Sequence, residues 1–304
     1  MKTKPLTRRD LLVAGGVLAV AAGTVNSRAA PAAVSGLTNA SARHDPLGGL
    51  RIDDPAFNVQ VIGKLQGDLS GRQRCIYNPG FLFAVGPSGA GQAPDDYGKL
   101  LLQLEGCTLR ISRQLADGSV EERSESWMFF CDPHTGEYLT EWRNPFSGEL
   151  LQVPPFRGGP GATRLTPHGP VLDTSLKLES TALDQPVRLR WRVMGPQVWL
   201  SRHAASRITA PEGQPRNEFS VDSWVCQLNH LTDSRRSWIP STYAWTSHGE
   251  WPRWFKLAGR PGNVIWRVES LLLDDPAELP SRFVGHTQAL LPGKLTNRLR
   301  FDTD

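Results

Sequence analysis

Two turn-like motifs near the middle of the chain hold side chains that could perform acid–base chemistry. Asp132 and His134 lie in Asp-Pro-His-Thr-Gly-Glu, and a related motif, Asn-Pro-Phe-Ser-Gly-Glu, begins at Asn144. A histidine beside a carboxylate can exchange a proton near neutral pH. The same residue types are also typical of tight turns that face solvent. Asp132 and His134 are therefore candidate catalytic residues, and turn formation is the alternative interpretation.

Aromatic residues gather in the C-terminal third of the chain and could line a binding pocket. Rigid indole rings with a few polar groups suit a flat or apolar small molecule. His248 lies beside this aromatic segment and is a further acid–base candidate. Packing of a large core is the alternative role for the rings. The residues that we expect at the pocket are Trp142, Arg143, Trp245, Trp251 and Trp254.

A row of arginines follows one side of a predicted strand. From Val187 to Val193 the odd positions are apolar and the even positions are Arg188, Arg190 and Arg192. Facing an interior, three guanidinium groups would form an anion site. Facing water, they would be a solvated surface. The sequence leaves both orientations open, and in the pocket hypothesis Arg190 orients the ligand.

The sequence lacks the common signatures of cofactor and metal chemistry. It has no Gly-x-Ser-x-Gly elbow, Walker A motif, His-Glu-x-x-His motif or dinucleotide fingerprint, so its cofactors stay unknown. The four cysteines have no Cys-x-x-Cys spacing, and we expect no metal site. They are read as buried thiols or as one or two disulfides with three pairings open: Cys75, Cys107, Cys131 and Cys226.

The first 32 residues are typical of a twin-arginine signal peptide. Arg8 and Arg9 precede an apolar stretch at 11–23, which is shorter than the ~20 residues that a bilayer span needs. Small residues at 29–33 offer a cleavage site. An ordinary secretory signal or an uncleaved anchor is the alternative. We therefore expect export to the periplasm by the twin-arginine translocase, with no stable membrane span after cleavage.

The signal segment also accounts for the net charge of the chain. The whole sequence has 34 basic and 30 acidic residues, of which the first 32 positions contain five basic and one acidic. The remainder is balanced at 29 of each sign. A neutral mature chain lacks the electrostatic footprint of a nucleic-acid-binding protein. Nucleic acid is therefore excluded as an expected partner.

Short alternating segments predict an all-β fold. Residues 106–112 place Cys107, Leu109 and Ile111 on one face, Asp117-Gly118 suits a hairpin turn, and the return strand reaches 127–131. In this register Cys107 faces a residue near Phe129, which argues against a disulfide between Cys107 and Cys131. Further strands are expected at 138–142, 176–179, 187–193 and 264–269.

These strands predict one antiparallel meander that closes into a large, lipocalin-like barrel with few helices. Frequent breaks by 24 prolines and 29 glycines favour many short strands, and closure would remove their exposed edges. We expect a flexible arm at 33–56 and a single domain at 57–304.

Several motifs resemble an uncharacterised bacterial family, domain of unknown function 1838. The resemblance covers roughly residues 57–292 and implies export by the twin-arginine route but no particular activity. At 154–160 the chain has Pro-Pro-Phe-Arg-Gly-Gly-Pro, where the family pattern leads us to expect a histidine and Asn-Asp-Pro. The motifs that carry the resemblance lie at 131–137, 141–145, 147–149, 237–240, 251–254 and 278–280.

Together these features lead to one functional hypothesis and two alternatives. The first is a periplasmic protein that binds a small apolar or aromatic molecule in a tryptophan-lined pocket. The second is a cofactor-independent lyase, isomerase or hydrolase that uses His248, or His134 with Asp132. The third is a structural or interaction protein of the cell envelope, which a long exposed apolar patch would favour.

Overall fold

The computed structural model describes residues 49–86, 97–173, 177–180, 185–209 and 216–301. Eleven strands form one antiparallel sheet in the order β7-β6-β3-β2-β1-β13-β12-β11-β10-β8, and β9 also pairs with β10. A separate two-stranded sheet joins β4 and β5. The strands are β1 (Arg74–Val85), β2 (Tyr97–Gln114), β3 (Val120–Cys131), β4 (Glu141–Arg143), β5 (Leu150–Gln152), β6 (Phe156–Thr166), β7 (Gly169–Asp173), β8 (Lys177–Ser180), β9 (Arg190–Met194), β10 (Gln197–Thr209), β11 (Arg216–Gln227), β12 (Ser241–Gly249) and β13 (Asn263–Leu273).

The helices are short and lie mainly near the two ends of the described chain. The predicted arm at 33–56 overlaps the start of helix α2, where Asp54 caps the first turn and proline occupies its first position. Residues 33–48 of that arm, like the predicted signal, lie outside the described residues. The helical elements are α2 (Pro55–Gln66), α3 (Leu228–Thr232), α4 (Ser281–Leu290), η2 (Arg253–Phe255), η3 (Pro276–Glu278) and η4 (Lys294–Thr296).

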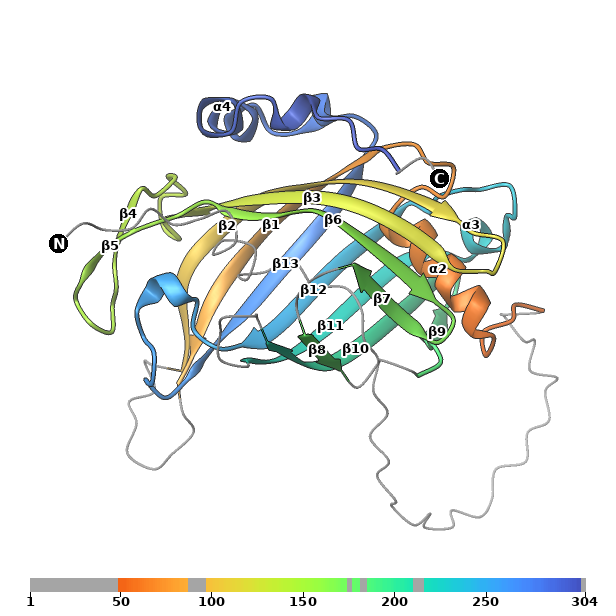
Figure 1. Cartoon of the computed structure of the whole chain (residues 1–304), viewed down its shortest axis with the longest axis horizontal. Coiled ribbons are helices and arrows are strands. Elements are labelled where there is room, and N and C mark those ends of the chain that lie inside the picture. Colours follow the sequence, from red (N-terminus) through yellow and green to blue (C-terminus); the bar gives the residue numbers. More distant parts are fainter. Residues whose placement is uncertain (1–48, 87–96, 174–176, 181–184, 210–215, 302–304) are drawn as a thin grey trace, which may run out of the picture.

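The sheet is strongly curved, and α2 lies at one end of its concave side (Figure 1). The predicted all-β antiparallel meander is confirmed. The predicted closed barrel is wrong, because no ladder among the described residues joins β7 to β8. These end strands have only five and four residues, which leaves little backbone to pair. Helix α2 packs against the apolar concave surface of β9, β10 and β11.

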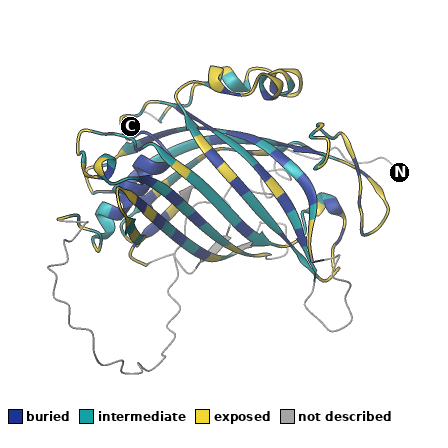
Figure 2. Ribbon diagram, turned by 180° about the vertical axis from the view of Figure 1, so that it is seen from behind, coloured by how far each residue is buried: buried dark blue, intermediate teal, exposed yellow. Residues whose placement is uncertain are grey.

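Alternation along the strands separates a concave and a convex face (Figure 2). On β1, Leu82 and Ala84 point to the concave side, whereas Cys75 and Tyr77 point to the convex side. Helix α4 covers part of the convex side, where Phe283 is fully buried against the strands. The sheet therefore has one enclosed face and one face that is only partly covered.

The concave face carries two apolar clusters. One surrounds α2, whose Val59 and Ile62 pack among residues of β9, β10 and β11. The other lies toward the β4–β5 hairpin and η2, where Phe130 and Phe255 are buried among tryptophans. A layer of polar side chains separates α2 from the aromatic cluster, as described below.

The predicted turns and hairpin are confirmed. The Asp132 and Asn144 motifs adopt the same conformation, with Gly136 at φ 74° and Gly148 at φ 71°, where glycine avoids the strain of a side chain. In each turn the glycine N–H donates to the Asx carbonyl, over 2.9 Å and 2.8 Å. The β2–β3 register places Cys107 opposite Trp127, so Cys107 and Cys131 are indeed not paired directly.

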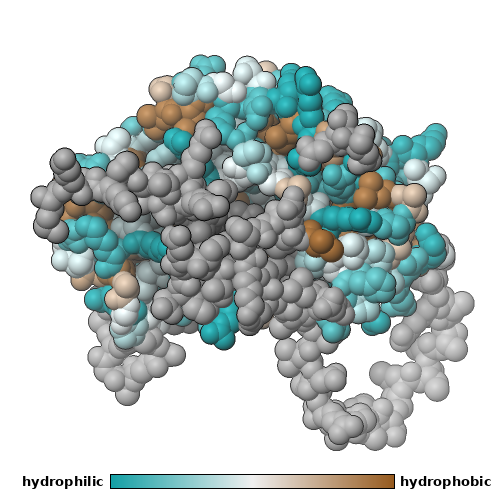
Figure 3. Space-filling model, in the orientation of Figure 1, coloured by the Kyte–Doolittle hydropathy of each residue, from teal (hydrophilic) through white to brown (hydrophobic). Residues whose placement is uncertain are grey.

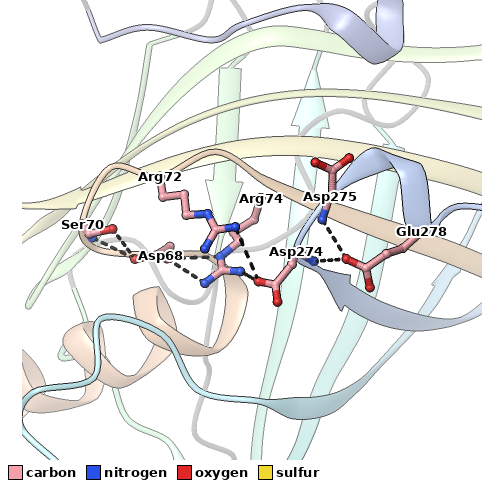
Figure 4. A network of polar contacts seen from close by, with 7 residues as sticks. All are labelled: Asp68, Ser70, Arg72, Arg74, Asp274, Asp275 and Glu278. Atoms are coloured by element: carbon pink, nitrogen blue, oxygen red, sulfur yellow. Dashed lines mark hydrogen bonds and ion pairs between the residues drawn. The ribbon is translucent and has the colours of Figure 1, made fainter.

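A polar network fixes the segment after α2 to the sheet (Figure 4). Arg74, with 1% of its side chain exposed, donates from Nη2 to Asp68 at 2.8 Å and also forms an ion pair with Asp274. Its guanidinium lies 4.2 Å from the ring centroid of Trp238. Glu278 in turn accepts hydrogen bonds from the backbone N–H groups of Asp274 and Asp275. The network ties the start of β1 to the end of β13.

Candidate functional site

The candidate site is centred on a buried carboxylate of the concave face. Asp222 on β11 lies opposite Arg202 on β10, whose Nε and Nη2 donate to its Oδ2 at 3.2 Å and 2.8 Å. The Tyr243 hydroxyl on β12 donates to Oδ1 at 2.7 Å. The exposed fractions of the Arg202 and Asp222 side chains are 2% and 6%. Three adjacent strands thus hold one carboxylate in place.

A second ion pair lies beside this site, on strands across the concave side of the curved sheet. Arg110 on β2 and Glu122 on β3 are 3.5 Å apart, and Arg110 also donates to the carbonyl of Gln66 at the end of α2. That carbonyl belongs to the negative end of the helix dipole, which favours a cation. The charge of Arg110 acts on both Asp222 and Tyr243, so the curvature brings β2 close to β11 and β12.

Burial dominates the electrostatics of the site. It raises the pKa of the Asp222 carboxyl above its usual value, although Arg202, Tyr243 and Arg110 all favour the ionised form. It also raises the pKa of Tyr243 well above its usual value, and the neighbouring Asp222 adds to this shift. Tyr243 therefore stays protonated at neutral pH and acts as a hydrogen-bond donor.

An aromatic surface adjoins the charged groups. Trp245 lies opposite Asp222 and Val268 in the ladders, so its side chain faces the concave side. Two buried donors here, Arg110 Nε and Trp245 Nε1, have no hydrogen-bond partner among the described residues. Most buried polar groups in native proteins are hydrogen-bonded, so such donors call for an acceptor. The arrangement can therefore bind an anionic or carbonyl group beside an aromatic wall.

Two predicted site residues lie on the opposite face from this site. His248 is opposite Phe219 and Ile265 on the convex side, because it is an odd number of positions from Trp245. Arg190 is exposed, and so are its neighbours Arg188 and Arg192. The arginine row is thus a solvated surface, which corrects the prediction that Arg190 orients a ligand inside the pocket.

The remaining acid–base candidates form turns. Asp132 accepts backbone hydrogen bonds from His134 and Thr135 at 2.9 Å and 2.8 Å, and these bonds lower its pKa. His134 is exposed, and its turn follows β3, four strands from His248 on β12, or about 19 Å along the sheet. The structure therefore does not bring these three residues together.

The predicted tryptophans do meet, at the far end of the concave face. Trp142 is 5.6 Å from Trp254 and 4.6 Å from Phe255 between ring centroids, and Trp251 extends the same cluster. Trp245 packs against it from β12. Arg143 is exposed and donates to the carbonyl of Gly148, so it supports the second turn. The cluster forms a packed aromatic wall next to the polar layer.

A second polar constellation lies on the convex side beneath α4. Tyr138 donates to Glu105, and Arg282 lies 3.7 Å from Glu105 and 4.4 Å from the Tyr138 ring centroid. His286 stacks on Tyr138 at 3.8 Å, and burial, reinforced by Arg282, lowers its pKa. These groups satisfy one another and anchor α4 to the turn after β3. Their contacts give them a structural role.

A third polar region borders the Arg74 network as a hollow of about 180 Å³. Arg74 is already bound by Asp68 and Asp274 there; Asp68 also accepts from Ser70, and Asp274 forms a second ion pair with Arg72 at 4.0 Å. Its charges are therefore balanced within the network. The concave site, with two donors lacking described partners, is the stronger candidate for ligand binding.

Sequence reasoning missed the charged residues of the concave site, although a signal was present. Val198, Leu200 and Ala204 occupy the same alternation phase as Arg202, and all three are buried. A charged residue in the apolar phase of a strand indicates an interior ion pair, since isolated charges are rarely buried. In the same way Asp222 shares the phase of a buried tryptophan at position 224.

Three further observations bear on the class of protein. Within the described residues, no group of three or more His, Cys, Asp and Glu side chains is placed to hold a metal ion. The helices of this part of the chain are too short or too polar to cross a bilayer. No family model and no curated protein matches the chain. The resemblance to domain of unknown function 1838 therefore stays a prediction.

Proposed function

We propose that the protein is exported by the twin-arginine route and binds a small molecule on the concave face of its sheet. The molecule combines a flat or apolar part with a carboxylate or another hydrogen-bond acceptor. One observation carries the proposal: Arg110 Nε and Trp245 Nε1 are buried donors without a partner among the described residues. Acceptor atoms on the ligand would satisfy these groups, while its rings lie against the aromatic wall.

The charges around the two donors support recognition of an anionic group. Arg110 offers a guanidinium that lies 3.5 Å from Glu122 and whose Nε has no partner among the described residues. Charge-assisted hydrogen bonds from a guanidinium to a carboxylate are about twice as strong as neutral ones. Trp245 offers both a ring face and an N–H. Together they fit an aromatic carboxylate better than a hydrocarbon.

Binding of 2-naphthoate, an aromatic carboxylate used as probe, tests the proposal. Quenching of tryptophan fluorescence is measured on the full chain and on two variants, Arg110→Met and Trp245→Phe. Matched controls are Arg190→Met and Trp199→Phe, whose side chains are exposed on the convex side. We expect about a tenfold loss of affinity in each site variant and none in the controls.

The outcomes of this experiment are distinct. Absence of probe binding by the unmodified chain would contradict the proposal, and so would equal affinity losses in the site variants and the convex-side controls. Native mass spectrometry of the protein from the periplasm of its own host adds a second readout. A bound small molecule that is lost on denaturation would support the proposal and give the mass of the ligand.

An enzymatic role on the same small molecule is the second candidate, and the Tyr243–Asp222 hydrogen bond favours it. A buried carboxyl group whose pKa is raised can act as a general acid or base, and Tyr243 holds Asp222 in place for this role. Asp222→Asn would then abolish turnover of a bound substrate while leaving its affinity nearly unchanged. Loss of affinity without any turnover in the unmodified chain would leave binding as the function.

A structural role in the envelope is less well supported. On the face shown in Figure 3, the apolar side chains of the described residues lie in separate patches between hydrophilic ones. Exposed apolar residues such as Phe81, Trp199 and Leu271 occur on different strands. Scattered exposed apolar residues are common on soluble proteins and do not by themselves indicate a docking surface.

A further inference from the structure

The four cysteines have very different surroundings, and two of them are in contact. Cys75 on β1 and Cys107 on β2 are buried, and their sulfur atoms are 3.2 Å apart. Cys226 lies on the concave face among the residues around α2. Cys131 lies on β3, four residues beyond Trp127, which is the residue opposite Cys107. About 13 Å along the strand therefore separates Cys131 from Cys107.

The sheet register explains the contact between Cys75 and Cys107. Cys75 is opposite Leu109, and Cys107 is opposite Tyr77, so the cysteines are diagonal neighbours on adjacent strands. Both side chains point to the convex face, beneath α4. Diagonal neighbours lie within reach of long side chains, and here the sulfurs are only about 1.2 Å farther apart than in a disulfide. A small movement of the two side chains suffices to join them.

We propose that Cys75 and Cys107 form a disulfide that cross-links β1 and β2, which selects one pairing among those that the sequence leaves open. The oxidant is a low-molecular-weight or protein disulfide. Two S–H bonds break and one S–S bond forms between the cysteines, while the oxidant's S–S bond is cleaved. The two electrons and two protons pass to the oxidant's sulfurs, which leave as thiols.

Helix α4 packs over the pair. Phe283 is fully buried, with its ring centroid 5.7 Å from that of Tyr77 and 6.5 Å from that of Trp127. It belongs to the same apolar cluster as both cysteines. Burial also raises the pKa of Cys107 well above its usual value, which disfavours the reactive thiolate. Packing beneath α4 therefore slows oxidation of the folded protein, although Cys75 also lines the hollow beside the Arg74 network.

Oxidised glutathione tests the pairing on the full chain. After incubation, free thiols are blocked with N-ethylmaleimide under denaturing conditions, and peptides are analysed by mass spectrometry without reduction. We expect one cross-linked peptide that joins Cys75 to Cys107, with the label on Cys131 and Cys226. Label on all four cysteines, or a cross-link of any other pair, would overturn the proposal. This result does not depend on export or on ligand binding.

The rate of cross-linking tests the role of α4. Phe283→Ala should speed oxidation about tenfold, whereas Leu290→Ala should not, because Leu290 is 48% exposed on the same helix. Equal rates in the two variants would overturn the role of α4.

A thermal measurement tests the pairing even if Phe283→Ala fails to fold, because it compares the Tm of the unmodified chain before and after oxidation. Oxidation should raise Tm by about 5–10 °C and should have no effect in Cys107→Ser, and a shift that persists in this variant would count against the pair.

Discussion

Removal of the Asp222 carboxylate should destabilise the protein more than almost any other single polar substitution. Asp222 accepts two hydrogen bonds from Arg202 and one from Tyr243, and only 6% of its side chain is exposed. Asp222→Leu leaves the guanidinium buried beside a hydrocarbon and deprives Tyr243 of its acceptor. Breaking a buried ion pair in this way costs about 3–5 kcal/mol, which is a large part of the stability of a typical domain.

The raised pKa of Asp222 indicates why Asp222→Leu is destabilising. The free energy is lost because Arg202 stays buried without its partner, and not because the ion pair itself contributes a large net stability. Because burial raises this pKa despite Arg202, desolvation of the carboxylate exceeds what its partners return. Replacing the whole group by apolar residues of similar size should therefore restore stability. The triple variant Asp222→Leu, Arg202→Met and Tyr243→Phe should lie within about 1 kcal/mol of the unmodified chain, or above it.

Urea unfolding, followed by tryptophan fluorescence and by far-UV circular dichroism, measures both effects. Trp224 stacks on Tyr243 at 5.4 Å and is fully buried, so its emission reports on this region. The two probes should give coincident transitions before a free energy is derived. A loss below about 0.5 kcal/mol in Asp222→Leu would refute the reasoning. So would a triple variant that is as unstable as the single one.

Two further predictions concern polar groups outside the concave site. Asp68→Ala should cost about 3 kcal/mol in urea unfolding, because Arg74 is 1% exposed and would keep only the partly exposed Asp274 as a counter-ion; a cost below about 1 kcal/mol would show that Asp274 suffices. The pKa of His286 is lowered in the folded chain, so the unfolded chain binds a proton on this imidazole more tightly. The contribution of neutral His286 to folding stability is therefore complete above about pH 6.5 and is lost as pH falls below it. His286→Phe should therefore lose less stability than the unmodified chain between pH 7.5 and pH 5.5, and equal losses would contradict this sign.

Features that depend on a few consecutive residues could be predicted from the sequence. The turns at Asp132 and Asn144 follow from an Asx side chain, a proline and a glycine, whose preferences act within six residues. The hairpin at Asp117-Gly118 likewise needs only a residue that tolerates positive φ, and Gly118 has φ 81°. Local chemistry of this kind is independent of the rest of the fold.

Helix α2 escaped detection because it has almost no solvent-exposed face. Its buried residues include Val59, Ile62 and Leu65 but also Asn58 and Lys64, so burial extends around most of the helix. A helix enclosed on several sides lacks the 3.6-residue apolar period on which sequence reading depends. The cap at Asp54, followed by proline, was the available signal.

The concave site could not be assembled from the sequence because its residues meet only through long-range pairing. Arg110 and Asp222 lie on β2 and β11, which three strands separate in the sheet. His248 and Trp245 are three positions apart on one strand, so only one of them can face the concave side. The sequence does not show which of the two alternating sets of side chains faces inward. A shift of one residue exchanges the two faces of a strand, so proximity in the sequence did not indicate proximity to the site.

The triple variant also separates two reasons for keeping charges inside this sheet. A slip of one residue between β10 and β11 would turn Asp222 to the convex side, so the ion pair with Arg202 helps to select the register. If that is its sole role, an apolar triple variant that folds uniquely should still bind 2-naphthoate as the unmodified chain does. Under the proposed function, Asp222 and Arg202 also set the electrostatics around the free donors of Arg110 and Trp245. Recovered stability together with about a tenfold loss of probe affinity would then show that the charges serve the ligand, while unchanged affinity would assign them to the fold.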